Sequence, residues 1–100
     1  MKNLINYITE STNADELQEE VGIALRKFGN IRNGFKYTDK QSIVEAMSQI
    51  GFEYDDESND DEKQMTFIGE YLNSEYEVDL YIANQTGDRV KLRNFNVFEN

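Results

Sequence analysis

Carboxylates are the side chains of this sequence with the most scope for chemistry, because it holds 20 Asp and Glu residues and no His or Cys. The chain therefore lacks imidazole bases, thiolate nucleophiles and the commonest zinc ligands. Two carboxylates can serve as acid and base on a sugar, but 20 of them single out no pair. It also lacks a G-x-S-x-G elbow, a P-loop and a glycine-rich dinucleotide motif. We predict that the protein is not an enzyme and has no catalytic residues and no cofactor.

The densest group of carboxylates is the acidic run 53–62, in which seven of ten residues are Asp or Glu. A calcium-binding loop counted from Asp55 fails, because Asp60 stands where the sharp turn needs glycine and Thr66 where the bidentate glutamate belongs. We therefore predict no metal site. The run is either a solvated connector or a surface for a basic partner. Its candidate partner-binding residues are Asp55, Asp56, Glu57, Asp60, Asp61 and Glu62.

A second acidic group is expected on a hairpin in the C-terminal third. If Asn73 and Ser74 form a two-residue turn, Glu70 lies opposite Glu77, where like charges cost up to about 1 kcal/mol. The next turn is expected to place Asp79 across from Arg93. An exposed antiparallel face is polar in any case, so this strip is either ordinary surface or a binding site. Its candidate partner-binding residues are Glu70, Glu75, Glu77 and Asp79, with Tyr54, Tyr71, Tyr76 and Tyr81 as candidate aromatic anchors.

Charge is divided unevenly along the chain. Residues 1–25 carry −4, 26–40 carry +4, 41–88 carry −12 and 89–100 carry +2, which gives a net charge of −10. The basic segment 26–40 interleaves cations with aromatic residues, as nucleic-acid-binding loops do. A net charge of −10 repels a polyanion, so we predict no direct nucleic-acid binding. Instead, we expect Phe28 and Ile31 to pack while the bases balance neighbouring acids.

Apolar residues at helical spacing predict two helices in the N-terminal region. A short helix is expected over residues 4–8, and the polar residues 11–13 are expected to interrupt it. The next helix is expected over residues 14–28, with Asn13 as its N-cap and Gly29 as its stop. Its buried stripe is predicted to contain Ala14, Leu17, Val21, Ala24, Leu25 and Phe28.

A further helix and three strands are expected in the rest of the chain. The helix begins with a capping box at residues 38–41, ends at Gly51 and buries Ile43, Val44, Met47 and Ile50. The strands are expected over residues 65–72, 76–83 and 89–98, because apolar residues there follow the alternation of a half-buried sheet. In the last strand the apolar parity changes after Leu92, which predicts a bulge or an early end near Asn94.

These elements indicate an α+β fold, with two to three N-terminal helices packed on a three-stranded antiparallel β-meander. The length supports a single acidic α+β domain over residues 1–100. The sequence lacks an apolar stretch of about 18 residues and a signal-peptide pattern, so we expect a cytoplasmic protein with no membrane partner. The oligomeric state is left open.

The charge pattern favours binding over chemistry, since Arg and Lys accept a carboxylate in place of a phosphate. In composition and size the chain resembles acidic phage-encoded anti-defence proteins, such as anti-CRISPR and DNA-mimic anti-restriction proteins. That resemblance implies an inhibitor that covers the basic nucleic-acid-binding surface of a host-defence nuclease complex. Two alternatives remain. One is an immunity protein or antitoxin for a basic nuclease toxin, and the other is a homo-oligomeric structural or accessory protein.

Overall fold

The computed structural model describes the backbone of residues 2–55 and 63–100, and the side chains of residues 13–55 and 63–100. Two α-helices, a 3₁₀ turn and seven strands lie in these parts of the chain. The bounds are α1 (Lys2–Ala24), η1 (Arg26–Phe28), β1 (Gly29–Asn30), β2 (Gly34–Phe35), β3 (Thr38–Asp39), α2 (Lys40–Gln49), β4 (Phe52–Tyr54), β5 (Gln64–Tyr71), β6 (Ser74–Thr86) and β7 (Arg89–Glu99). None of the described helices is long and apolar enough to cross a membrane.

The main sheet is antiparallel with the strand order β3-β7-β6-β5-β4, so the predicted α+β class is confirmed. The expected three-stranded meander is present as β5, β6 and β7, but the sheet is wider than predicted. Strands of two and three residues, β3 and β4, add an edge on each side. Such short segments carry no alternating signal in the sequence. They pair because the chain entering α2 runs beside β7 and the chain leaving α2 runs beside β5.

The helix α1 is one continuous element, so the predicted interruption at residues 11–13 and the N-cap at Asn13 are wrong. Ser, Thr and Asn cost only a few tenths of a kcal/mol each inside a helix, and no Gly or Pro stands there to break it. The α-helix ends at Ala24, and residues up to Phe28 form the 3₁₀ turn η1. Gly29 then stops the helical segment as predicted, with a φ of +126°.

The N-cap of α2 lies one residue later than the expected capping box implies, at Asp39 instead of Thr38. The Asp39 side chain makes no capping hydrogen bond. Residues Thr38–Asp39 pair as β3 with the start of β7. The predicted stop is confirmed, since Gly51 has a φ of +88° and its N–H donates to the carbonyl of Ser48. Ile43 and Met47 are buried as predicted, while Val44 and Ile50 are only partly buried.

The turn between β5 and β6 lies one residue earlier than expected. Leu72 and Asn73 occupy it, with φ values of +50° and +69°, as in the primed turns of two-residue hairpins. In the resulting register Gly69 faces Tyr76, so the smallest residue of β5 stands beside a fully buried ring. A Cβ on Gly69 would lie 2.4 Å from the carbonyl oxygen of Gly51, so this position accepts only glycine without movement of the backbone.

The predicted bulge near Asn94 is confirmed. The β6–β7 register shifts between Tyr81 and Ile82, opposite Asn94 and Leu92, and shifts again just beyond Ile82. The strand does not end there but continues to Glu99. Because of the bulge, Leu92 and Phe95 both reach the core although they are three residues apart.

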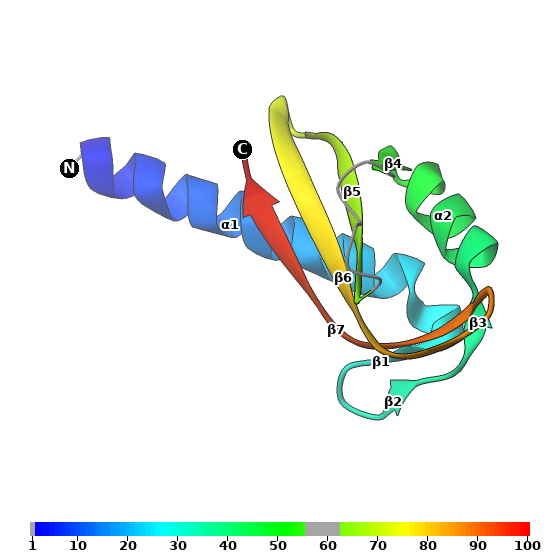
Figure 1. Cartoon of the computed structure of the whole chain (residues 1–100). Coiled ribbons are helices and arrows are strands. Elements are labelled where there is room, and N and C mark those ends of the chain that lie inside the picture. Colours follow the sequence, from blue (N-terminus) through cyan, green and yellow to red (C-terminus); the bar gives the residue numbers. More distant parts are fainter. Residues whose placement is uncertain (1, 56–62) are drawn as a thin grey trace.

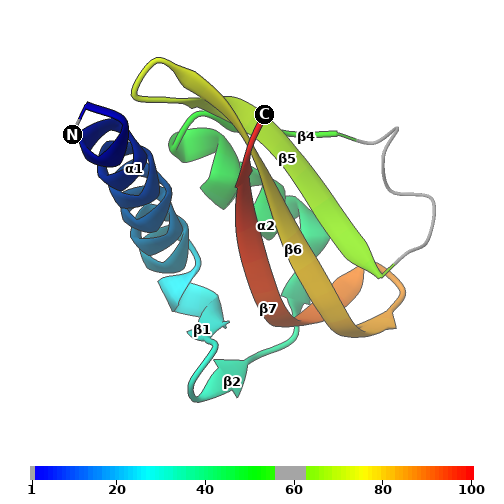
Figure 2. The same ribbon diagram turned by 90° about the vertical axis from the view of Figure 1, so that its left-hand side faces the viewer.

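Both helices pack on one face of the sheet (Figures 1 and 2), and the core lies between them and the strands. From α1, the residue that follows it and α2, the core contains Leu17, Val21, Leu25, Ile43, Ala46 and Met47. From the main sheet it contains Phe52, Met65, Phe67, Tyr76, Val78, Leu80, Ile82, Val90, Leu92 and Phe95. Each of the large apolar side chains contributes about 1.5–3 kcal/mol through burial. Phe28 is buried as predicted, but Ile31 is 48% exposed in the β1–β2 loop, so its predicted packing is wrong.

Candidate functional site

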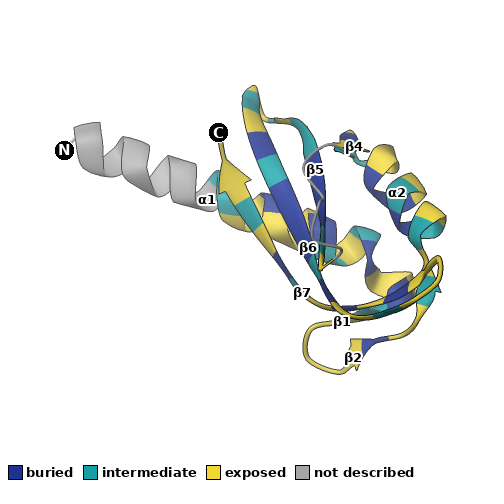
Figure 3. Ribbon diagram, viewed as in Figure 1, coloured by how far each residue is buried: buried dark blue, intermediate teal, exposed yellow. Residues whose placement is uncertain are grey.

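The sheet face opposite the helices holds the candidate site. Side chains alternate along β6, so Val78 and Leu80 point into the core while Glu75, Glu77 and Asp79 point to the other side. The alternation of buried and more exposed residues along β6 is visible in Figure 3. The helices therefore cover one face of the sheet and leave the acidic side chains of β6 on the other.

Three consecutive rows across the strands each contain two carboxylates. The rows are Glu70–Glu75, Glu53–Ile68–Glu77–Phe98 and Asp55–Thr66–Asp79–Asn96. Asp55 continues the register of β4, because its N–H donates to the carbonyl of Thr66 at 2.8 Å. No position in these rows is Lys or Arg. We call the six carboxylates the acidic face: Glu53, Asp55, Glu70, Glu75, Glu77 and Asp79.

The row nearest the hairpin pairs two exposed carboxylates. Glu70 and Glu75 stand directly opposite each other, where like charges are destabilising by a few tenths to about 1 kcal/mol. Asn100 offsets part of this cost, since its Nδ2 donates to Glu75 Oε1 at 3.1 Å. The backbone N–H of Asn100 also donates to the carbonyl of Glu75 at 2.9 Å, which ties the end of the chain to this row.

The row farthest from the hairpin contains a buried carboxylate. Asp79 is only 7% exposed, and Thr66, which is also buried, donates its hydroxyl to Asp79 Oδ1 at 3.1 Å. Gln64 Nε2 in turn donates to Thr66 Oγ1 at 3.0 Å. This relay of donors compensates part of the desolvation of the Asp79 carboxylate.

Glu77 occupies the middle row and is the carboxylate most affected by its neighbours. A hydrogen bond with Asp79 is the main cause that raises the pKa of Glu77, followed by burial and by the charges of Asp79 and Asp55. All four causes act in the same direction, because each disfavours the charged form of Glu77. A cation placed over Glu77 would relieve this electrostatic strain.

The structure corrects two expected pairings of this strip. Glu70 faces Glu75 rather than Glu77, because the turn lies one residue earlier. Asp79 faces Asn96 rather than Arg93, because the register of β7 differs from the expected one and Arg93 lies in the bulged region. The Arg93 guanidinium lies over the ring of Tyr81 instead, 5.4 Å from its centroid.

The structure brings together five of the ten predicted partner-binding residues in these rows: Asp55, Glu70, Glu75, Glu77 and Asp79. The other five fall outside the described residues: Asp56, Glu57, Asp60, Asp61 and Glu62. Of the candidate aromatic anchors, only Tyr81 lies on the sheet face opposite the helices, which is the face that carries the acidic residues. Tyr76 is 1% exposed in the core, and Tyr54 packs on the core side against Phe67 at 5.3 Å between ring centroids.

Three residues on the sheet face opposite the helices are not indicated as site residues by the sequence: Glu53, Ile68 and Phe98. Glu53 belongs to the acidic run in the sequence, but nothing in the sequence assigns β4 to the edge of β5, so the sequence does not indicate Glu53 as a site residue. Ile68 and Phe98 have the sequence pattern of ordinary strand residues. The alternation within β5 would have placed Ile68 opposite the buried side chains of Met65 and Phe67, which was an available signal.

Acidic residues also gather on the helical side of the molecule. The hydroxyl of Tyr71 donates to Glu16 Oε2 of α1 at 3.5 Å. Burial is the main cause that raises the pKa of Tyr71, followed by the charges of Glu16 and Glu20. These helix carboxylates belong to another surface and provide a natural control for the acidic face.

The bases of β7 lie at the opposite end of the sheet from the hairpin that joins β5 and β6. Arg89 forms an ion pair with Asp39 at 4.0 Å and donates to the carbonyl of Tyr37 at 3.2 Å. Both side chains of the ion pair are more than half exposed, so it contributes little to stability. The carboxylates of the acidic face thus lie toward the β5–β6 hairpin, and the bases of β7 lie toward the other end of the sheet, where Asp39 pairs with Arg89.

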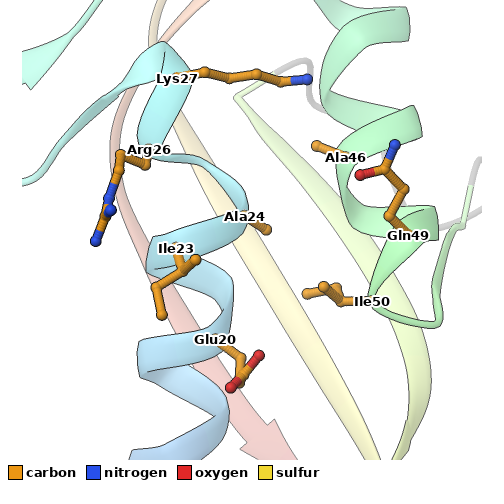
Figure 4. A pocket seen from close by; sticks show the side chains of 8 residues that line it. All are labelled: Glu20, Ile23, Ala24, Arg26, Lys27, Ala46, Gln49 and Ile50. Carbon is orange, nitrogen blue, oxygen red and sulfur yellow. The ribbon is translucent and has the colours of Figure 1, made fainter.

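A groove separates the C-terminal turns of the two helices (Figure 4). It has a volume of about 610 Å³ and is lined by Glu20, Ile23, Ala24, Arg26, Lys27, Ala46, Gln49 and Ile50. Its floor is mainly aliphatic, and Lys27 extends across it toward α2. Because both helices cover the core side of the sheet, the groove is not part of the acidic face.

The residues that the structure describes include no group of three or more carboxylates arranged to hold a metal ion. No protein-family model, curated protein or solved structure shows significant similarity to the chain.

Proposed function

We propose that the protein is an inhibitor that covers a basic nucleic-acid-binding surface of another protein with its acidic face. The observation that carries this proposal is the arrangement of six carboxylates in three adjacent rows on a sheet face that no described helix covers. The target class that we propose is a nuclease of a host-defence system, in line with the acidic anti-defence proteins that the chain resembles in composition and size.

The charge density of the acidic face supports a role in place of nucleic acid. Glu75 and Asp79 are four residues apart, so the three rows span about 13 Å along the strand. Over that length one DNA strand carries about four phosphates and a duplex about eight. Six carboxylates fall between these values, although the burial of Asp79 lowers the number that a partner can reach directly.

The energetic cost of assembling these acids also supports a binding role. Glu70 opposite Glu75 and Glu77 beside Asp79 both oppose folding, since they bring like charges together. A bound cationic surface would turn this unfavourable term into a favourable one. The same field would steer a basic partner toward the face and accelerate association at low salt.

The test uses a hexa-arginine peptide as a defined cationic probe and amide chemical shifts of the protein as the readout. We expect the largest shifts at residues 68–70, 75–79 and 96–98, and an affinity that falls steeply with salt. The triple variant Glu70→Gln/Glu75→Gln/Glu77→Gln should bind about tenfold more weakly, a loss of about 1.4 kcal/mol.

The matched control is Asp15→Asn/Glu16→Gln/Glu19→Gln on α1, because both triple variants lower the net charge from −10 to −7. We expect this control to keep most of the affinity. Equal losses in the two variants would show that the peptide responds to net charge alone, and shifts centred on α1 would show that it binds the helix instead of the acidic face. Self-association that is insensitive to salt would favour the structural alternative instead.

A further inference from the structure

An exposed aromatic ring lies directly beside the central carboxylate of the acidic face. Phe98 pairs with Glu77 across β6 and β7, and its side chain is 44% exposed. Directly opposite side chains on an antiparallel pair have Cβ atoms about 4.5–5.5 Å apart. A large apolar ring at such a position has no role in the core, which lies on the other face of the sheet.

The same face already holds one guanidinium on an aromatic ring. Arg93 lies over Tyr81 at 5.4 Å from the ring centroid, within the range of an attractive cation–π contact. Asn96 lies between Arg93 and Phe98 along β7, and its Nδ2 donates to the Tyr81 hydroxyl at 3.4 Å. The chain thus shows, with its own arginine, how a guanidinium can lie on this surface.

We propose that Glu77 and Phe98 together form a site for an arginine side chain of the partner protein. This inference rests on the proposed function and specifies the chemistry of the partner. The planar guanidinium can stack on the Phe98 ring while its N–H fork pairs with the Glu77 carboxylate. An ammonium is a compact, strongly hydrated point charge, so a lysine gains less from the same two groups.

The surrounding residues favour a large planar cation at this point. Ile68 flanks Glu77 on the other side, so the central row presents the carboxylate between two apolar side chains. Apolar neighbours remove water from the ion pair and strengthen it. Asp79 and Asp55 add negative charge in the next row, which increases the attraction for a positive group. That row contains no aromatic residue on which a guanidinium could stack.

The experiment compares hexa-arginine with hexa-lysine at the same ionic strength, using the natural chain and amide shifts to locate each peptide. We expect both peptides to bind the acidic face and hexa-arginine to bind about two- to fivefold more tightly, the gain of one stacked guanidinium at an exposed site. In Phe98→Leu, which keeps an apolar side chain without a ring, this ratio should fall, because only the pairing of the guanidinium with the Glu77 carboxylate then distinguishes arginine from lysine.

The matched control is Tyr37→Leu, because Tyr37 is also an exposed aromatic residue, at 40%, and is absent from the three rows. It should leave the ratio of the two affinities unchanged. Equal affinities of the two peptides for the natural chain, or an unchanged ratio in Phe98→Leu, would overturn the arginine site and leave the proposed function standing. Failure of both peptides to bind the acidic face would overturn the proposed function itself.

Discussion

Replacing Glu77 with Gln is expected to stabilise the protein at neutral pH. In the natural chain the pKa of Glu77 is raised by hydrogen bonding of its protonated form to Asp79, by burial and by the charges of Asp79 and Asp55. A Gln side chain has nearly the same shape, carries no charge and offers an N–H donor to Asp79 at any pH. The substitution therefore removes the repulsion and supplies at every pH the hydrogen bond that the natural chain makes only when the Glu77 carboxyl is protonated.

The magnitude follows from the cost of adjacent like charges in a sheet, which is a few tenths to about 1 kcal/mol. For a domain of this size, 1 kcal/mol changes the Tm by about 4–8 °C, so we expect an increase of about 1–8 °C. The gain depends on pH. Because the folded-state pKa of Glu77 is raised, its protonation stabilises the natural chain fully below the ordinary pKa of 4.5. That stability is lost as the pH rises through the raised value.

The assay is thermal unfolding of both chains at about pH 7.5 and about pH 5, with the advantage of Glu77→Gln larger at the higher pH. Glu45→Gln on α2 makes the same change of charge at an exposed position away from the acidic face. It should show little change in Tm at either pH. A lower Tm for Glu77→Gln, or the same gain at both pH values, would refute this account of the site.

Two further predictions concern the framework of the acidic face. Gly69→Ala should lower the free energy of unfolding by about 1–3 kcal/mol, because the new Cβ would collide with the carbonyl oxygen of Gly51. Its control, Gly22→Ala on α1, meets only ordinary contacts and should raise stability by about 0.5–1 kcal/mol, both measured by urea unfolding. Thr66→Val should cost about 1–3 kcal/mol, since it removes the donor to the buried Asp79 carboxylate, and Thr66→Ser should restore most of that loss. A neutral Thr66→Val would show that Asp79 finds other donors.

Local pattern was sufficient for the central elements of the fold. Residues Tyr76, Val78, Leu80 and Ile82 alternate with polar neighbours, and that period decided both the strand and its buried face. The change of parity after Leu92 was sufficient to predict the bulge. Local composition predicts a shorter helix than α1, because it leaves the N-terminal turns marginal, whereas the tertiary packing of Leu17 and Val21 anchors the helix.

The sequence indicates several of the acids of the candidate site, but not which residues face one another across the strands. Four of its acids lie on β5 and β6, where the alternation of each strand already indicated the outer face. The partners of each acid depend on the turn, and Leu72 in the left-handed region is not a residue that sequence rules place there. A shift of one residue at that turn replaced Glu77 by Glu75 as the neighbour of Glu70.

The sequence by itself determined the number of carboxylates, their uneven distribution along the chain and the strands that carry several of them, because these depend on composition and on a period of two residues. Only the tertiary structure decided that Glu53 and Asp55 join the same face, that Asp79 is buried against Thr66, and that Phe98 stands beside Glu77. Cross-strand neighbours are set by register and by short edge strands. These arise from packing between segments far apart in the chain, which no local pattern records.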